Sequence, residues 1–285
     1  MSDQDRYIPG VPCWVDTNQP DADAAVAFYR GVFGWEFEDV TPPGAPVRYL
    51  LALLRGAPVA GIASQLEGVE RAVAWDTYVW VADADETASR IRDAGGTVLR
   101  EPDDVGESGR TALCADVDGA EFCLWQPDQH RGAAVVNEAG ALNFNDLHAS
   151  DLSRAAGFYG AVFGWEILDI GGGSAWALPG YGDFLERRTP GMRERMASMG
   201  APERFEDVVA SVVQGTPAHW GVTFGADDAD AIASRAIELG GRVIAQPFDA
   251  PWSRTTVISD PQGAAFTASQ FVPENKDVRA PASAA

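Results

Sequence analysis

The chain has 285 residues, a formal net charge of -21, and 46% hydrophobic against 22% charged residues. This length and this balance are typical of a globular protein large enough for two domains. The negative charge argues against polyanionic partners, because nucleic acids and anionic membranes are bound by basic patches. We therefore expect no nucleic-acid partner and no membrane partner.

Cysteine use and hydropathy predict the compartment. The sequence has no long apolar run and no basic segment followed by an apolar one, so we expect neither a membrane span nor a signal peptide. The three cysteines, Cys13, Cys114 and Cys123, are an odd number at no spacing typical of a metal site. A cytoplasmic protein without a disulfide framework is the expectation.

The first half of the chain divides into two units, each with a strand, a helix and three further strands. The first helix is predicted to begin near Asp21 and Asp23, whose charges suit the positive end of a helix dipole, and to stop at Gly34. In chain order we predict a strand at 11–18, a helix at 21–33, strands at 35–39, 47–54 and 58–64, a strand at 75–81, a helix at 83–94, and strands at 97–101, 109–115 and 121–126.

The second half repeats the plan of the first. The segment 27–36 recurs at 157–166, with Phe, Tyr, Val, Phe, Gly, Trp and Glu at the same places, and such a repeat predicts one duplicated module. The elements predicted here are a strand at 141–148, a helix at 151–163, strands at 165–170 and 219–225, a helix at 228–239, and strands at 242–248, 254–259 and 264–271.

The spacing of the repeat reveals an insertion in the second half. Tyr29 and Tyr159 are 130 residues apart, whereas Trp75 and Trp220 are 145 apart. We expect the extra residues near 183–217, with helices at 189–199 and 206–213, as surface decoration or as a lid over a site. The predicted organisation is a flexible N-terminus at 1–10, a first module at 11–126, a linker at 127–140, a second module at 141–271 and a disordered tail at 272–285.

The repeated motif Phe-Tyr-x-x-Val-Phe-Gly-Trp-Glu resembles the vicinal oxygen chelate superfamily, which contains glyoxalases, extradiol dioxygenases and bleomycin-resistance proteins. Val81-Ala82-Asp83 before the second helix, Ala94-Gly95-Gly96 after it and the Asp-x-x-Gly turn before the last strand agree with that resemblance. The chain is most similar to two-module glyoxalase-like proteins of actinobacteria. The resemblance implies an α+β fold in which tandem βαβββ units form two half-barrel modules, each with a ligand on its concave face.

The resemblance also implies where a metal would be bound. Enzymes of this superfamily take metal ligands from three places: near the start of the first strand, near the start of the fifth, and in the eighth. The matching positions are Trp14, Asp76 and Cys123 in the first half and Phe144, Gly221 and Thr267 in the second. Because an indole, a phenyl ring and a glycine supply no ligand atom, we expect no metal at the usual position and no other cofactor. A divalent metal held elsewhere, for example by Asp76 and Glu121, is the alternative.

Strand alternation predicts which residues line the two concave faces. An apolar face with a few polar groups is typical of a small-molecule site, and we interpret this set as ligand-binding, with Asp146 and His148 as candidate catalytic residues. Other interpretations stay open: Asp16 and Asp146 as anchors of the turn after the first strand, the aromatics as core, Cys123 as a buried small residue and His148 as structural. The ligand-binding candidates are Trp14, Asp16, Asn18, Asp76, Tyr78, Glu121, Cys123, Trp125, Phe144, Thr223 and Thr267.

Three functions fit these observations. The favoured one is a metal-free protein that binds a hydrophobic or aromatic small molecule in a cup-shaped face, for sequestration or resistance. The second is an enzyme, a lyase, isomerase or hydroxylase/dioxygenase-type oxidoreductase acting on an oxygenated metabolite. It would use acid–base chemistry through His148 with Asp146 or Asp16, or a metal at non-standard positions. The third is a sensor whose insertion contacts a protein partner. A small-molecule ligand is the expected partner, and the chain is expected to be a monomer or a homodimer.

Overall fold

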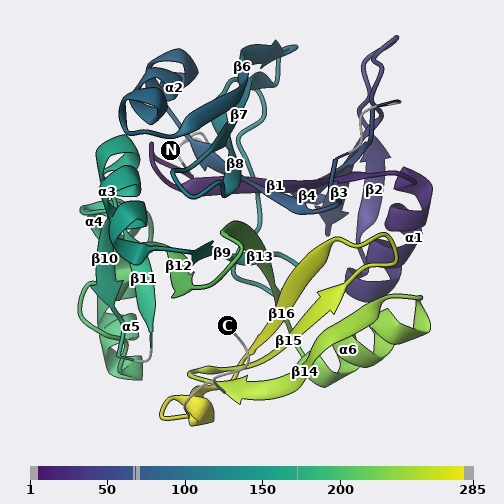
Figure 1. Cartoon of the computed structure of the whole chain (residues 1–285). Coiled ribbons are helices and arrows are strands. Elements are labelled where there is room, and N and C mark those ends of the chain that lie inside the picture. The colour runs from purple at the N-terminus through teal and green to yellow at the C-terminus, as the bar shows by residue number, and fades with distance from the viewer. Residues whose placement is uncertain (1–5, 67, 69–70, 172, 279–285) are drawn as a thin grey trace.

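Two eight-stranded sheets, one from each half of the chain, make up the fold (Figure 1). The computed structural model describes residues 6–66, 68, 71–171 and 173–278. The first sheet has the order β2-β3-β4-β1-β5-β8-β7-β6, and the second has the equivalent order β10-β11-β12-β9-β13-β16-β15-β14. The predicted α+β fold with two vicinal-oxygen-chelate modules is confirmed.

The elements follow the predicted order in the first half, whereas in the second half β11, α4 and β12 were not predicted at their places. The first half contains β1 (Pro12–Gln19), α1 (Ala22–Phe33), β2 (Glu36–Asp39), β3 (Tyr49–Leu54), β4 (Ala57–Ser64), β5 (Trp75–Trp80), α2 (Ala84–Asp93), β6 (Thr97–Val105), β7 (Gly109–Ala115) and β8 (Glu121–Pro127). The second half contains β9 (Leu142–Ala149), α3 (Leu152–Phe163), β10 (Glu166–Asp169), β11 (Ser174–Ala177), α4 (Tyr181–Arg188), α5 (Met192–Met199), η2 (Phe205–Asp207), β12 (Val208–Gln214), β13 (His219–Ala226), α6 (Ala229–Glu238), β14 (Arg242–Ala250), β15 (Ser253–Ser259), β16 (Ala265–Phe271) and η3 (Pro273–Asn275).

Local chemistry sets the ends of the first helix in each half. Asp21 caps α1 by accepting a hydrogen bond from the backbone N–H of Ala24 at 2.9 Å, and Asp151 caps α3 in the same way. Gly34 and Gly164 end these helices with φ values of 71° and 75°, a left-handed conformation that glycine adopts without strain. The helix bounds therefore come from the sequence itself.

The two sheets are back to back and share their cores. Helices α1 and α6 lie together on one side of the molecule and α2 and α3 on the other, while the concave faces of the sheets point away from each other (Figure 1). One core joins Phe28 and Trp35 to Phe224 and Phe266. The other joins the second unit of the first half to the first unit of the second half. Each half therefore forms one complete sheet and contributes residues to both cores.

The repeated helix motif carries the contact between the halves. The hydroxyl of Tyr29 donates to Asp260 Oδ2 at 3.0 Å, and the hydroxyl of Tyr159 donates to Asp116 Oδ2 at the same distance. All four side chains are buried. Each tyrosine thus links a first helix to the last hairpin of the opposite half, and burial without these partners would be costly.

The N-terminal segment differs from the prediction of flexibility at 1–10. Residues 6–10 are packed: the hydroxyl of Tyr7 donates to the carbonyl of Ala133 at 2.9 Å, and the carbonyl of Gly10 accepts the indole N–H of Trp165 at 2.8 Å. The amide of Gly10 also donates to the carbonyl of Trp80. These contacts tie the segment to both halves of the chain. Residues 1–5 lie outside the described residues.

The insertion lies between β11 and β12, at residues 178–207, and holds α4, α5 and η2. The helix predicted at 206–213 is wrong, because β12 occupies Val208–Gln214 and pairs in parallel with β9. Its valines suit a strand, and burial of the alternate residues Ala210 and Val212 shows that one face of it packs in the core. The expected range 183–217 therefore includes strand β12, and the inserted residues begin at 178, before the expected start.

The tail is also more ordered than predicted for 272–285. Pro273–Asn275 form the 3-10 helix η3, and the amide of Val272 donates to the carbonyl of Trp252 at 2.8 Å. The side-chain amide of Asn275 donates to the carbonyl of Ser253 at 2.9 Å. The tail is thereby held against the β14–β15 hairpin. Residues 279–285 lie outside the described part of the chain.

A search of the described residues for a helix long and apolar enough to cross a membrane finds none.

Candidate functional site

An aspartate lies at the same position of the central strand on each concave face: Asp16 in β1 and Asp146 in β9. On the first face, the hydroxyls of Tyr49 and Tyr78 both donate to Asp16 Oδ2 at 2.9 Å. Tyr49 comes from β3, and Tyr78 comes from β5 on the other side of β1. The carboxyl group is therefore held from both sides by neutral donors, and neither aspartate serves as the anchor of the turn after its strand.

A glycine makes room for one of these tyrosines. Gly61 of β4 is the register partner of Asp16, and a Cβ at Gly61 would lie 2.2 Å from the hydroxyl oxygen of Tyr49. The same hydroxyl accepts the indole N–H of Trp14 at 3.0 Å. The absence of a side chain at Gly61 is what lets Tyr49 reach from β3 across β4 to β1.

The carboxyl group of Asp16 is set up to hold or release a proton near neutral pH. Burial raises its pKa to about 7, the charge of Asp76 adds to the rise, and the hydrogen bonds from Tyr78 and Tyr49 oppose it. The residue is 4% exposed, and its Oδ1 atom has no hydrogen-bond partner among the described residues. A buried, unpartnered carboxyl oxygen of this kind is a candidate for proton transfer or ligand contact.

A charged cluster lies beside Asp16 on the first face. Arg71, from the β4–β5 connection, donates from Nη1 to Asp76 Oδ2 at 2.7 Å and from Nη2 to Asp76 Oδ1 at 2.8 Å. Its Nη2 also donates to Glu121 Oε2 at 2.8 Å. The amide of Asn18 donates to Asp76 Oδ2 at 3.2 Å. Burial raises the pKa of Asp76, and the guanidinium beside it opposes that rise.

Aromatic side chains fill the rest of the first face. Trp14 is 2% exposed, Trp125 and Cys123 are also buried, and burial raises the pKa of the Cys123 thiol. His130, from the segment between the sheets, packs edge-on against Trp14 at 4.4 Å between ring centroids and against Trp125 at 5.6 Å. The burial of these aromatic side chains agrees with the interpretation of them as core residues.

The second face has the same arrangement without a second carboxyl group or an arginine beside the aspartate. Asp146 accepts hydrogen bonds from the hydroxyls of Ser211 and Thr223, the latter at 2.5 Å. Ser211 of β12 pairs with Asp146 as Gly61 pairs with Asp16. Burial raises the pKa of Asp146, and the two hydroxyls oppose the rise. Each carboxylate oxygen therefore has a partner.

The second face is also more open. Phe144 and Thr267 remain partly exposed, whereas their counterparts Trp14 and Cys123 are buried. Phe271, four residues beyond Thr267 in β16 and on the same face by strand alternation, is 61% exposed. Phe271 also lines a pocket of about 330 Å³, together with Met199, Trp252, Pro273, Glu274 and Lys276.

His148 does not form the expected pair with Asp146. In the described residues Asp146 takes its hydrogen bonds from Ser211 and Thr223, and the ring of His148 instead stacks on His219 with centroids 4.2 Å apart. Burial lowers the pKa of His148 to about 4, and the neighbouring His219 contributes. Among the described residues, no hydrogen bond links His148 to Asp146, so the geometry does not pair the two for the proposed acid–base role.

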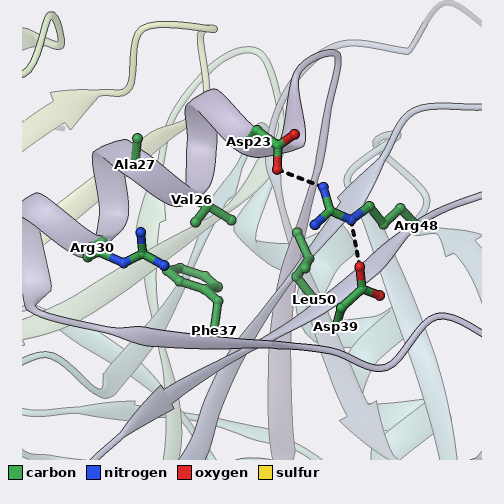
Figure 2. Close-up of a pocket in the computed structure, with 8 residues that line it drawn as sticks. All are labelled: Asp23, Val26, Ala27, Arg30, Phe37, Asp39, Arg48 and Leu50. Carbon is green, nitrogen blue, oxygen red and sulfur yellow. Dashed lines mark hydrogen bonds and ion pairs between the residues drawn. The ribbon is translucent and has the colours of Figure 1, made fainter.

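A larger pocket, of about 370 Å³, lies behind the first sheet between α1 and strands β2 and β3 (Figure 2). Arg48 there bridges Asp23 at 2.6 Å and Asp39 at 2.7 Å, and Arg30 lies over the ring of Phe37. The charges of Arg48 are already balanced by exposed carboxylates. This pocket is separate from both concave faces, and its polar groups do not converge on a common point, so its size alone carries no function.

Comparison with known proteins identifies the family. Residues 14–124 match the Glyoxalase/Bleomycin resistance protein/Dioxygenase superfamily, and residues 143–269 match the Glyoxalase-like domain. The chain is 36% identical over 279 residues to "Putative glyoxylase CFP32" of Mycobacterium tuberculosis, covering 96% of this chain and 100% of that protein. The chain is a two-module member of the glyoxalase superfamily.

Other relatives agree with this assignment. The "Anthracycline biosynthesis protein DauV" of Streptomyces sp. (strain C5) is 33% identical, covering 92% of this chain and 94% of that protein. Among solved structures, the Mn(II)-bound glyoxalase from Novosphingobium aromaticivorans has a TM-score of 0.59 at 16% identity, covering 92% and 82% of the two chains. The 2,3-dioxygenase LapB from Pseudomonas sp. KL28 has a TM-score of 0.60 at 12% identity, covering 93% of each. These structures show the shared fold.

The metal positions of the glyoxalase superfamily do not fit a divalent cation here. The indole of Trp14 can only donate, and it donates to Tyr49. Both oxygens of Asp76 are bound by Arg71, and the thiol of Cys123 is buried with a raised pKa. Over the residues with described positions, no group of three or more His, Cys, Asp or Glu side chains could hold a metal ion.

The structure brings together most of the residues that strand alternation predicted on this glyoxalase-like chain. On the first face Asp16 and Tyr78 are hydrogen bonded, and Asn18, Asp76 and Glu121 belong to the neighbouring charged cluster. On the second face Thr223 contacts Asp146. The sequence reasoning missed Tyr49, Arg71, Ser211, Trp252 and Phe271. The alternation of β16 could have revealed Phe271, whereas Arg71 and Trp252 come from connections, for which the sequence holds no such signal.

Proposed function

We propose that the protein binds a small, oxygenated aromatic molecule on the concave face of its second sheet, without a divalent metal. The observation that carries the proposal is the floor of that face, where Phe144 and Thr267 are partly exposed. A pocket of about 330 Å³ lies beside Phe271, at the end of the same strand as Thr267. Pockets that hold small molecules have volumes of about 300–1,000 Å³ and mostly apolar walls with a few polar groups. The hydroxyls of Thr267 and the Asp146 cluster would supply those polar groups.

The relatives support the ligand class. Two proteins that are 33% and 31% identical over 277 residues are named as anthracycline biosynthesis proteins, and anthracyclines are oxygenated polycyclic aromatic compounds. The ring of Phe144, partly exposed on the face, offers an aromatic surface on which such a ring system can stack. Because the face carries few charges, it favours a neutral ligand.

Ligand titration followed by tryptophan fluorescence tests the proposal. A panel of hydroxylated quinones and other polycyclic aromatics is added to the full chain, and the quenching of its nine tryptophans is recorded. We expect saturable quenching with one ligand per chain, unchanged by EDTA. Phe144→Ala is expected to weaken binding about 10-fold, because it removes roughly 1–2 kcal/mol of aromatic contact.

The matched control is Arg30→Ala, in the pocket behind the first sheet (Figure 2). It should leave the dissociation constant unchanged. The proposal is contradicted if no member of the panel gives saturable quenching. It is equally contradicted if Phe144→Ala and Trp252→Leu both bind as tightly as the unaltered protein, or if EDTA abolishes binding.

A second candidate function is acid–base catalysis on the first face, favoured by one specific observation. Asp16 combines an unpartnered Oδ1 atom with a pKa of about 7, which matches the requirement for a general acid or base near neutral pH. The reaction class is proton removal from, or return to, a carbon next to a carbonyl group. Asp16 would transfer the proton while Tyr49 and Tyr78 hold its other oxygen.

Hydrogen exchange into the ligand tests this second candidate. Any aromatic ketone that binds is incubated with the protein in D₂O, and deuterium uptake is followed by NMR. We expect uptake that depends on a group with a pKa near 7 and that is lost in Asp16→Asn but retained in Asp146→Asn. Uptake that survives in Asp16→Asn contradicts the candidate.

A further inference from the structure

The guanidinium of Arg71 is the centre of the charged cluster on the first face. It makes three hydrogen bonds of 2.7–2.8 Å to the carboxylates of Asp76 and Glu121. Its backbone carbonyl is held by the side-chain amide of Gln65 at 3.0 Å. A bidentate contact with one carboxylate, combined with a second carboxylate, fixes the planar group in one orientation.

The cluster has the composition of a site for a hard cation. Asp76 is 5% exposed, and a buried carboxylate needs a compensating charge. Divalent cations such as Mg²⁺ and Mn²⁺ are commonly held by one or two carboxylates, with water completing the shell. Nη2 of Arg71 lies 2.8 Å from an oxygen of Asp76 and 2.8 Å from an oxygen of Glu121. Nη2 therefore occupies the point from which a metal ion would contact both carboxylates. The carboxylate oxygens would have to move closer to that point by roughly half an ångström to reach metal–oxygen distances.

The second sheet has none of the three charged residues of this cluster at the equivalent positions. In the repeat, the positions equivalent to Asp76 and Glu121 hold Gly221 and Ala265. The position equivalent to Arg71 holds Thr216, because Arg71 precedes Trp75 by four residues as Thr216 precedes Trp220. If Arg71 were a surface residue with an incidental contact, it would have no reason to accompany the two carboxylates. Its presence only where they are present indicates that the three act as a unit.

We propose that Arg71 is a built-in cation that takes the position of a divalent metal ion on the first face. The guanidinium neutralises Asp76 and Glu121 and blocks metal entry between them. Its side chain is 30% exposed, so part of it remains accessible to solvent. Removing the guanidinium while keeping the carboxylates should convert the cluster into a metal site.

Mn²⁺ binding, measured by electron paramagnetic resonance on the full chain, tests this proposal. We expect Arg71→Gln to bind one Mn²⁺ about 10- to 100-fold more tightly than the unaltered protein, the range over which groups around a metal change its affinity. Arg71→Lys keeps the positive charge and should bind no more Mn²⁺ than the unaltered protein. Arg71→Gln with Asp76→Asn should lose the gained affinity.

Two outcomes overturn the proposal. One is a folded Arg71→Gln protein whose Mn²⁺ affinity equals that of the unaltered protein. The other is an unaltered protein that already binds one Mn²⁺ tightly and loses it on Asp76→Asn.

A stability measurement keeps the test decisive if Arg71→Gln folds poorly. Charge neutralisation requires that adding Asp76→Asn to Arg71→Gln restores most of the melting temperature that Arg71→Gln loses, because the buried charge is then gone. A double variant as unstable as Arg71→Gln alone overturns the proposal. None of these measurements depends on a ligand of the second face.

Discussion

The two concave faces have the same frame and opposite character. Each places an aspartate at the centre of its sheet and surrounds it with two hydroxyls. On the first face those hydroxyls are phenolic, and the neighbouring position holds a second carboxyl group, Asp76. On the second face the hydroxyls come from Ser211 and Thr223, and glycine takes the neighbouring position. One duplicated module has thus diverged into a charged, filled face and a neutral, open one.

The difference shows how the same backbone position acquires different chemistry. Burial and, after it, the charge of Asp76 raise the pKa of Asp16 to about 7, and its Oδ1 atom has no partner among the described residues. Asp146 has Gly221 as its neighbour and both oxygens bonded. The second carboxyl group with its paired arginine and the change from phenolic to aliphatic hydroxyls distinguish the two environments, whereas the strand order around them is the same.

The largest expected contrast comes from truncating the aromatic residue at the matched position of each face. Trp14→Ala should lower the free energy of unfolding by about 3–5 kcal/mol, because the indole is buried and its removal leaves a cavity. Phe144→Ala should cost about 1–2 kcal/mol, because its ring is already partly exposed. Urea unfolding of both variants measures the contrast. Equal losses would show that the two faces are filled to the same degree.

The next contrast is the pH dependence of stability. Because the folded pKa of Asp16 is raised from 3.8 to about 7, the folded state binds the proton more tightly than the unfolded chain. That contribution to stability is fully present below about pH 4 and is lost as the pH rises through about 7. Each tenfold difference in proton affinity between the folded and unfolded states corresponds to about 1.4 kcal/mol.

Asp16→Asn should therefore remove this loss, so that the variant gains stability relative to the unaltered protein between pH 4 and pH 8. Its amide oxygen can still accept from both tyrosines. Asp146→Asn, the matched control, should instead cost about 1 kcal/mol at neutral pH, because one hydroxyl must reorient. Thermal melts across that range measure both. An Asp16→Asn protein with the same pH profile as the unaltered chain would contradict the assignment.

The smallest contrast concerns how the hydroxyls reach the two aspartates. Gly61→Ala should cost about 1–3 kcal/mol, because the new methyl group collides with the hydroxyl of Tyr49. Ser211→Ala, at the equivalent position, should cost about 1 kcal/mol through one lost hydrogen bond. Adding Tyr49→Ala to Gly61→Ala tests the cause, since the added Cβ would otherwise lie 2.2 Å from the hydroxyl oxygen and 2.7 Å from Cζ of Tyr49: the methyl group should then cost no further stability beyond that of Tyr49→Ala alone. A Gly61→Ala protein as stable as the unaltered chain would show that Tyr49 is not confined there.

The sequence by itself determined the repeat, the order of the elements outside the insertion and its flanking strands, and the family. These are local properties: helix caps such as Asp21 and Gly34 act on their own backbone, and strand alternation assigns a face to each residue of a strand. For that reason Asp16, Tyr78 and Asp146 were placed correctly on the same faces as their neighbours. The helix predicted at 206–213 failed because pairing with β9 makes that segment a strand.

Only the tertiary structure decided what covers each face. Tyr49 reaches Asp16 across a glycine of another strand, and Arg71 arrives from a connection, so neither contact follows from a local pattern. His130 packs on the aromatics of the first face from a segment that the sequence marked only as a linker. Such contacts depend on the curvature of the sheet and on the path of the loops. The sequence therefore predicted the residues of the two faces, and folding determined which face is filled and which is open.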